Sequence, residues 1–350
     1  METFESVVRA EFAPKNTFLN TASSGLLPAR SVAALHEAVA LRAAGAPLDP
    51  LFEDVERARA SFARLAGVPA GRVAAGPSVA AHTGLVAASL PAGAEVLTAE
   101  ADFTSVVNPF HMRADLKVRT VPLERLADSV RPGTALVAVS AAQSADGRIA
   151  DLPALRAAAA THGARTYVDF SQAAGWLPMD ADASDFTVST TFKWLLGPHG
   201  VAFLVVPEDF GALRPVLAGW VAGEKPWDSC YGPIEELARS ARRFDVSPAL
   251  FSHAGLRASL ALIEEIGVAA VHAHDLALAD RFRAGLAGLG HEALPAPGSA
   301  IVSVPGLGHR RPELARAGIE VSARAGHLRA SFHLYNTPTD VDHLLNTLSD

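Results

Sequence analysis

Lysine is rare in this chain, and one lysine lies where a charged side chain is unexpected. Only four of the 30 lysine and arginine residues are lysines: Lys15, Lys117, Lys193 and Lys225. Lys193 interrupts an apolar run, DFTVSTTFKWLLGPHGVAFLVV, whose pattern predicts a strand, a turn and a second strand. Burying an ammonium group is costly unless it is paired, neutralised or used covalently. Lys193 therefore suits an amine that loses its proton and forms an imine, and the alternative is a lysine whose charged end reaches water.

A candidate acid lies upstream of this lysine. Asp169 follows a short apolar strand expected at 165–168, and Ser171 and Gln172 come directly after it. Open parallel sheets bind ligands outside the carboxyl ends of their strands, although an acid that caps the next helix is the alternative. Only one further strand separates Asp169 from Lys193, so one pocket can hold both. An imine-forming lysine and an acid that protonates a pyridine nitrogen are what a pyridoxal phosphate (PLP) site requires.

The elements that would position these residues alternate along the chain. Helices are expected at 30–42, 51–65, 85–90 and 152–162, and strands at 95–97, 116–120, 135–140, 165–168, 185–189 and 201–206. This alternation predicts an α/β fold with a mostly parallel sheet that is covered on both faces. After Pro248 the pattern becomes α+β, with helices at 254–266 and 269–289, strands at 301–304 and 329–333, and a last helix from 339.

We therefore expect a large PLP-binding domain at 16–247 and a small C-terminal domain at 248–350, with 1–15 packing as an N-terminal segment. With 350 residues, 49% of them hydrophobic, the chain can bury a substantial core.

Composition argues against several classes of protein. The apolar runs are shorter than the ~20 residues that cross a bilayer, and the acidic N-terminus is unlike a signal peptide. The single cysteine, Cys230, excludes intrachain disulfides and cysteine-rich metal sites, and we expect no metal. A net charge of −7 gives no reason to expect nucleic-acid binding. A cytoplasmic protein without membrane or nucleic-acid partners is expected.

Seven segments carry a resemblance to one enzyme family. In chain order they are FLNTASSGLLP from Phe18, AAGPSVAAHTGLVAASL from Ala74, EADFTSVVNPF from Glu100, YVDFSQAAG from Tyr167, TTFKWLLGPHGVAFLVV from Thr190, RRFDVSPALFSHAGLRASLALIEEIG from Arg242 and LRASFHLYNTPTDVDHLL from Leu328. Together they resemble the aminotransferase class V family of fold type I PLP enzymes, which includes cysteine desulfurases, kynureninases and isopenicillin N epimerase. The resemblance implies PLP held as a Schiff base on Lys193, and a homodimer.

The resemblance also implies roles for residues around the cofactor. Asp169 would keep the ring nitrogen protonated, Gln172 would bond the phenolate oxygen, and Phe103 would stack on the ring. The cofactor phosphate would be bound by Ser78 and Val79 at a helix start, by Thr190, and by Ser247 of the neighbouring subunit. Ser78 is equally suited to an ordinary helix cap, which is compatible with anion binding.

On the substrate side, the resemblance assigns Arg329 to the α-carboxylate of an amino-acid substrate, a role that suits a planar guanidinium. Asn20, Thr21, Ser24 and Gln143 match segments that line this side in the family.

Departures from the family pattern reduce the number of reactions that we expect. Desulfurases carry a cysteine on a loop between an Arg-x-Gly element and the carboxylate-binding arginine, and here RAGHLR, from Arg324, has that loop deleted. Phe192 stands where desulfurases have a histidine next to the lysine. A persulfide mechanism is therefore not expected. His199 is expected as a turn residue, and His82, His111 and His327 receive no role.

The expected substrate is a small molecule, either an amino acid or an amine of any side-chain size, and several reactions remain open. An aminotransferase is favoured, followed by a carbon–sulfur or other β-lyase, and then by an epimerase, which needs a second base. A non-catalytic PLP-fold protein would be expected to lose Lys193, Asp169 or Arg329, and all three are present. A nicotinamide-dependent enzyme also fits the alternation, but no G-x-G-x-x-G opens the first helix.

Overall fold

A mostly parallel sheet forms the centre of the molecule. In the computed structural model, which describes residues 3–349, the largest sheet has seven strands in the order β2-β8-β7-β6-β5-β3-β4. β8 runs antiparallel to β2 and β7, and the other pairings are parallel. The strands are β2 (Val73–Gly76), β3 (Glu95–Ala99), β4 (Lys117–Val121), β5 (Thr134–Ser140), β6 (Arg165–Asp169), β7 (Phe186–Thr190) and β8 (Ala202–Val205). This sheet confirms the predicted α/β fold.

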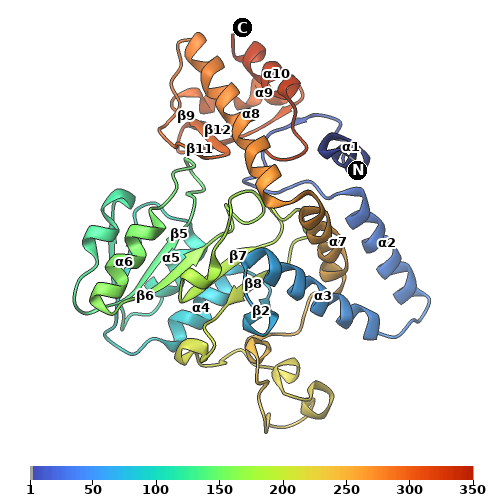
Figure 1. Cartoon of the computed structure of the whole chain (residues 1–350), viewed down its shortest axis with the longest axis vertical. Helices are drawn as coiled ribbons and strands as arrows, with labels where there is room; N and C mark the ends of the chain where they lie inside the picture. Colours follow the sequence, from blue (N-terminus) through green and yellow to red (C-terminus); the bar gives the residue numbers. More distant parts are fainter. Residues whose placement is uncertain (1–2, 350) are drawn as a thin grey trace.

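Helices cover both faces of the sheet (Figure 1). On one face, Phe62 of α3 stacks on Phe203 of β8, with ring centroids 4.6 Å apart, and Leu256 of α7 joins the same core. On the other face, Phe110 of α5 packs against Tyr167 of β6 in a second core. The helices are α2 (Ala29–Ala43), α3 (Asp49–Ala66), α4 (Val79–Ser89), α5 (Thr104–His111), α6 (Leu152–His162) and α7 (Leu250–Ile266).

The C-terminal elements gather at one end of the molecule, beside the N-terminal segment (Figure 1). They are α8 (Val268–Gly288), β9 (Ile301–Val304), α9 (Arg311–Arg316), β10 (Ile319–Glu320), β11 (Ser322–Arg324), β12 (His327–Ser331) and α10 (Pro338–Ser349). β11, β12 and β9 form an antiparallel sheet, while β1 (Thr17–Phe18), which follows α1 (Phe4–Glu11), pairs in parallel with β10. The chain from 17 to 24 thereby lies between the C-terminal sheet and the turn that connects β7 to β8.

The predicted domain division at 247 stays a prediction. Helix α7, which follows residue 247, packs on the central sheet, and the next helix, α8, packs on the C-terminal sheet. Between β8 and α7 the chain forms four 3₁₀ helices, all within residues that the structure describes: Phe210–Ala212, Trp220–Ala222, Pro226–Ser229 and Ala241–Phe244. This stretch extends from the end of the molecule opposite α10 (Figure 1).

Candidate active site

Lys193 is buried in the turn that connects β7 to β8. Its side chain is 5% exposed, whereas the other three lysines are exposed. Its Nζ lies 4.9 Å from the centroid of the Phe103 ring. Burial lowers the pKa of Lys193 to about 8, and the positive charge of Arg329 acts in the same direction, against that of Asp169. Compared with an ordinary lysine, this pKa makes the uncharged, nucleophilic amine roughly 300 times more abundant near neutral pH.

The turn around Lys193 is held closely by neighbouring backbone. The carbonyl of Phe192 accepts a hydrogen bond from the N–H of Gly25 at 2.9 Å. A Cβ on Gly25 would lie 2.1 Å from the carbonyl oxygen of Lys193, so only glycine fits there. Leu196 closes the turn with a φ of 56°, in the left-handed region that residues with a Cβ rarely adopt.

Asp169 ends β6, the strand next to β7, and is 2% exposed. Burial raises its pKa to about 6, against the hydrogen bond that Ser171 N–H donates to Oδ1 at 2.8 Å and against the charge of Lys193. The carboxyl is therefore mostly ionised at neutral pH and lies near the buried amine. The structure thus brings together the acid and the lysine that the sequence singled out, and their roles toward a cofactor stay predictions.

Asp102 organises the part of the site around Phe103. Its carboxylate accepts hydrogen bonds from the N–H of Phe103 at 2.6 Å, the N–H of Ser140 at 2.8 Å and the side-chain amide of Gln143 at 3.2 Å. Ala101, directly before it, has a φ of 56°. The ring of Phe103 is 44% exposed and faces Lys193, so an aromatic surface is available to a ligand there.

The residues predicted to bind a phosphate lie at one edge of the sheet. Gly76 of β2 and Thr190 of β7 pair with the same residue, Ala202, from opposite sides of β8. Ser78 follows Gly76 as the exposed N-cap of α4, and Val79 is the first residue of that helix. The N-terminus of α4 and the Thr190 hydroxyl thus flank β8 near Lys193, and a helix N-terminus favours anions.

His82, on α4, has a structural place. Its Nε2 lies 3.2 Å from the carbonyl oxygen of Ala202, and burial lowers its pKa to about 4. His199 stacks on Phe192 with ring centroids 3.9 Å apart, within the turn where the sequence expects it.

Arg329, on β12, is 1% exposed and has no carboxylate partner within residues 3–349. It donates from Nη2 to Ser23 Oγ at 2.7 Å, from Nε to Ser322 Oγ at 3.0 Å, and from Nη1 to the hydroxyl and carbonyl of Ser144. Burial lowers its pKa, and the charge of Arg324 adds to this effect. A buried guanidinium that is held only by neutral groups is suited to an anionic ligand.

Gln172 is fully hydrogen-bonded in this structure. Its Oε1 accepts from Trp194 Nε1 at 2.8 Å, and its Nε2 donates to the carbonyl of Ala22 and to Ser144 Oγ, both at 2.9 Å. Its predicted bond to a cofactor oxygen would have to replace one of these contacts.

The three N-terminal residues predicted for the substrate side differ in their surroundings. Asn20 accepts from Ser23, which contacts Arg329, and Ser24 Oγ donates to the carbonyl of Phe192 at 3.4 Å. Thr21 instead bonds Tyr335 and is fully buried. Its partner is therefore a core residue and not Arg329.

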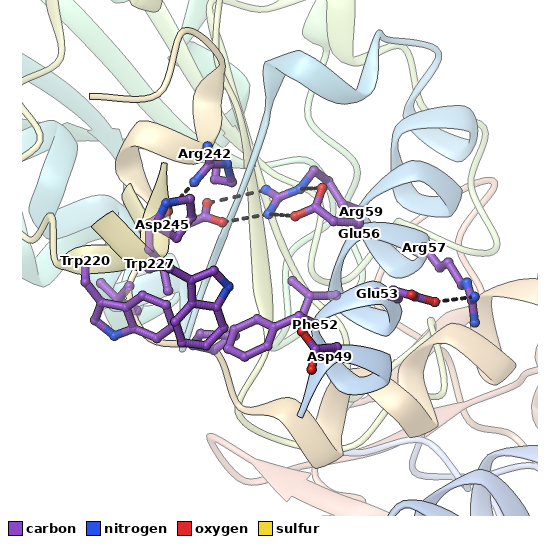
Figure 2. Close-up of a pocket in the computed structure, with 15 residues that line it drawn as sticks. Asp49, Phe52, Glu53, Glu56, Arg57, Arg59, Trp220, Trp227, Arg242 and Asp245 are labelled. Atoms are coloured by element: carbon purple, nitrogen blue, oxygen red, sulfur yellow. Dashed lines mark hydrogen bonds and ion pairs between the residues drawn. The ribbon is translucent and has the colours of Figure 1, made fainter. Parts of the chain in front are cut away.

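Ser247 is exposed, and a buried ion pair anchors its segment. Asp245 accepts from Arg59 (Figure 2) and from the N–H of Ala75 on β2, the latter at 2.8 Å. These contacts form one wall of a cavity of about 620 Å³, whose rim holds the aromatic side chains of Phe52, Trp220 and Trp227 (Figure 2). None of the residues predicted for the active site lines this cavity.

Several contacts escaped the sequence analysis because they involve ordinary serines and backbone. Ser23 and Ser144 hold Arg329, and Trp194 holds Gln172. Ser23 and Ser144 each lie next to a residue that was singled out, so adjacency was the only signal.

The aminotransferase class V family model matches residues 49–344. This chain belongs to that family. The uncharacterized aminotransferase YcbU of Bacillus subtilis is 28% identical over 85% of this chain and 84% of its own length. Isopenicillin N epimerase of Streptomyces clavuligerus is 31% identical over 94% of this chain and 93% of its own. Apo cysteine desulfurase from Thermococcus onnurineus matches the fold with a TM-score of 0.88 at 22% identity, covering 100% of this chain and 98% of that one.

Membership confirms three predictions: the family, an enzyme, and PLP as the cofactor. The described residues fit that cofactor, because a buried amine of lowered pKa, a buried acid, an available aromatic ring and a free helix N-terminus surround one site. Within residues 3–349, no helix is long and apolar enough to cross a membrane.

Proposed function

We propose that this protein is a PLP-dependent aminotransferase that acts on an α-amino acid, with Lys193 as the residue that carries the cofactor and moves the proton. The observation that supports it most is the charge arrangement of the site. A buried amine of lowered pKa lies beside an ionised acid, and a buried guanidinium without a carboxylate partner lies on the substrate side. PLP, when bound, supplies an electron sink for the substrate α-carbon.

The roles proposed for the side chains follow from their surroundings. With the cofactor bound, the Nζ of Lys193 would accept a proton from the substrate α-carbon and pass it to the cofactor carbon that is bonded to the substrate nitrogen, which requires an amine that is readily uncharged at neutral pH. Asp169 holds a proton on the ring nitrogen by its negative charge. Arg329 binds the substrate carboxylate, and Ser23 and Ser144 orient the guanidinium. Phe103 covers the ring on one face and excludes water.

Three features favour transamination, two of them by disfavouring a persulfide-forming desulfurase and an epimerase. The chain's only cysteine, Cys230, is exposed in the 3₁₀ stretch and lines a different pocket, which disfavours a persulfide-forming desulfurase. Phe103 and Phe192 carry no ionisable proton, so they offer no second base of the kind that an epimerase needs. YcbU, a relative over most of both chains, is named as an aminotransferase.

The proposal includes a homodimer in a cytoplasmic setting. Ser247 is exposed, and large apolar side chains are exposed in the preceding stretch, among them Val216, Leu217, Trp227 and Tyr231. Exposed apolar groups in one region are typical of a contact surface.

The decisive experiment is a panel of amino acids mixed with the PLP-loaded protein. An aminotransferase converts the bound cofactor to its amine form and releases keto acid in equal amount, without ammonia. Release of sulfide or ammonia would assign a β-lyase instead, and inversion of the α-carbon without either product would assign an epimerase.

A further inference from the structure

A buried pair of an acid and an imidazole lies behind the Lys193 turn. Asp275 of α8 and His333, two residues beyond the end of β12, are each 0% exposed, and Oδ2 of Asp275 lies 2.9 Å from Nδ1 of His333. The other ring nitrogen, Nε2, lies 3.0 Å from the carbonyl oxygen of Trp194, the residue that follows Lys193. The pair comes from the C-terminal part of the chain and reaches the turn of the central sheet.

The two oxygen partners of His333 limit the forms in which both of its hydrogen bonds can be made. Both ring nitrogens face oxygen atoms, and a neutral imidazole has only one N–H to donate. Either the ring is doubly protonated beside an ionised Asp275, or the acid donates its proton to Nδ1. In both forms Nε2 donates to Trp194 and the pair carries no net charge. The pair therefore contributes little field at Lys193, and its available effect is geometric.

Burying Asp275 and His333 costs folding free energy that apolar side chains in the same positions would not cost. The other oxygen of Asp275, Oδ1, has no partner within residues 3–349, and burial raises the pKa of this acid. Well-packed apolar residues often replace buried ion pairs without loss of stability. The presence of the pair is explained if its hydrogen bond to the Trp194 carbonyl is needed to hold the turn around Lys193.

Three consecutive backbone carbonyls of the turn, those of residues 192–194, each accept a hydrogen bond. The carbonyls of Phe192 and Lys193 accept from Gly25 and Leu196, and that of Trp194 accepts from His333. Trp194 also binds Gln172 through its indole N–H, and Gln172 binds Ser144, which contacts Arg329. The turn that carries the amine and the arginine of the substrate side are thus joined by continuous hydrogen bonds.

We infer that His333 is a positioning residue for Lys193: held by Asp275, it fixes the Trp194 carbonyl and so the turn from which the amine points at Phe103. This inference rests on the proposed role of Lys193 as carrier of the cofactor. Besides Asp275, the ionisable groups around His333 are His274 of α8 and Tyr335, whose ring lies 5.7 Å from that of His333.

Two variants separate positioning from packing. The double variant His333→Leu/Asp275→Leu fills the space with apolar groups and removes the hold on Trp194. Asp275→Asn keeps it, because a neutral His333 still donates from Nε2 while Nδ1 accepts from the new side-chain amide. The matched control is His253→Leu, since His253 is 1% exposed and, within residues 3–349, its ring bonds only the carbonyl of Ala249, the N-cap of its own helix.

For each protein, a pH titration of the visible absorbance band of the bound cofactor gives the spectral pKa. Steady-state kinetics then give kcat and KM. In the double variant, water reaches the loosened turn and the spectral pKa rises by about one unit. Its kcat falls by about 10²-fold while KM stays close to that of the wild type, because misplacement of a reacting group costs rate. Asp275→Asn and the control keep the wild-type spectral pKa.

A folded double variant with the wild-type spectral pKa and kcat would overturn the inference, and so would an Asp275→Asn protein that shifts as far as the double variant. If the double variant does not fold, His333→Phe decides: its ring fills the same space but cannot donate to the Trp194 carbonyl, so an unchanged spectral pKa would overturn the inference. A wild-type protein that shows no visible absorbance band of bound cofactor would instead contradict the proposed function.

Discussion

Replacing Lys193 with methionine is expected to stabilise the cofactor-free protein. Burial lowers the pKa of Lys193 from 10.5 to about 8, so the folded state disfavours the charged amine. At about 1.4 kcal/mol per pKa unit, this costs the folded protein about 3 kcal/mol at pH 7, where the unfolded chain holds a fully protonated amine. The cost declines as pH rises from 8 towards 10.5 and is absent above that range.

Part of this gain is offset by Asp169. Without the charge of Lys193 the pKa of this buried acid rises further above about 6, which costs stability at neutral pH. We therefore expect Lys193→Met to raise the free energy of unfolding by about 2 kcal/mol at pH 7. At pH 10 the gain should shrink to less than about 1 kcal/mol.

Urea unfolding of the cofactor-free proteins at the two pH values measures this difference. Lys117→Met is the matched control, because Lys117 is exposed on β4 and its replacement should give no pH-dependent gain. The reasoning is refuted if Lys193→Met is less stable than the wild type at pH 7, or if its gain is the same at both pH values. A stability cost of this kind is expected of a residue that is kept for its chemistry.

The remaining predictions concern turnover and assembly. Asp169→Asn should retain PLP and fold normally but lose most turnover, because the ring nitrogen loses its protonating partner; near-normal turnover would make Asp169 a structural cap. Arg329→Ala should raise the KM for an α-amino acid by roughly tens to thousands of fold, at ~1.4 kcal/mol per decade, with PLP content unchanged. An unchanged KM would argue for a substrate without a carboxylate. Sedimentation should show a homodimer, with an interface of over ~2,000 Å² if it is obligate, and Ser247→Ala should weaken PLP binding. A fully active monomer would contradict both statements.

The apolar pattern of the sequence predicted most of the central sheet. The runs before and after Lys193 appear as β7 and β8, because buried strands are continuous apolar segments of four to eight residues. The apolar pattern alone indicated a helix only at 85–90, since VAAHTGLVAAS is apolar on all sides and shows no helical period. The helix start expected around Ser78 and Val79 is where α4 begins in the structure. α5 was not predicted among the helices, and it contains Pro109, which normally disfavours a helix interior.

The site was predictable only where a residue type is itself informative. A lone buried lysine and an acid at a strand end signal chemistry, and the structure brings the two side chains near each other. The pairing of Asp275 with His333 joins residues 58 positions apart, and the bond to Trp194 uses a backbone carbonyl. Such contacts depend on how α8 and β12 pack on the central sheet, and no local pattern encodes that packing.

The central claim is that Lys193 carries the cofactor, and borohydride reduction of the PLP-loaded protein tests it most directly. Reduction fixes the cofactor to the amine that holds it, and digestion with mass spectrometry then locates the adduct. We predict a single phosphopyridoxyl group on the peptide that contains Lys193, and no stable adduct in Lys193→Ala. An adduct on Lys15, Lys117 or Lys225, or one that persists in Lys193→Ala, would contradict the account.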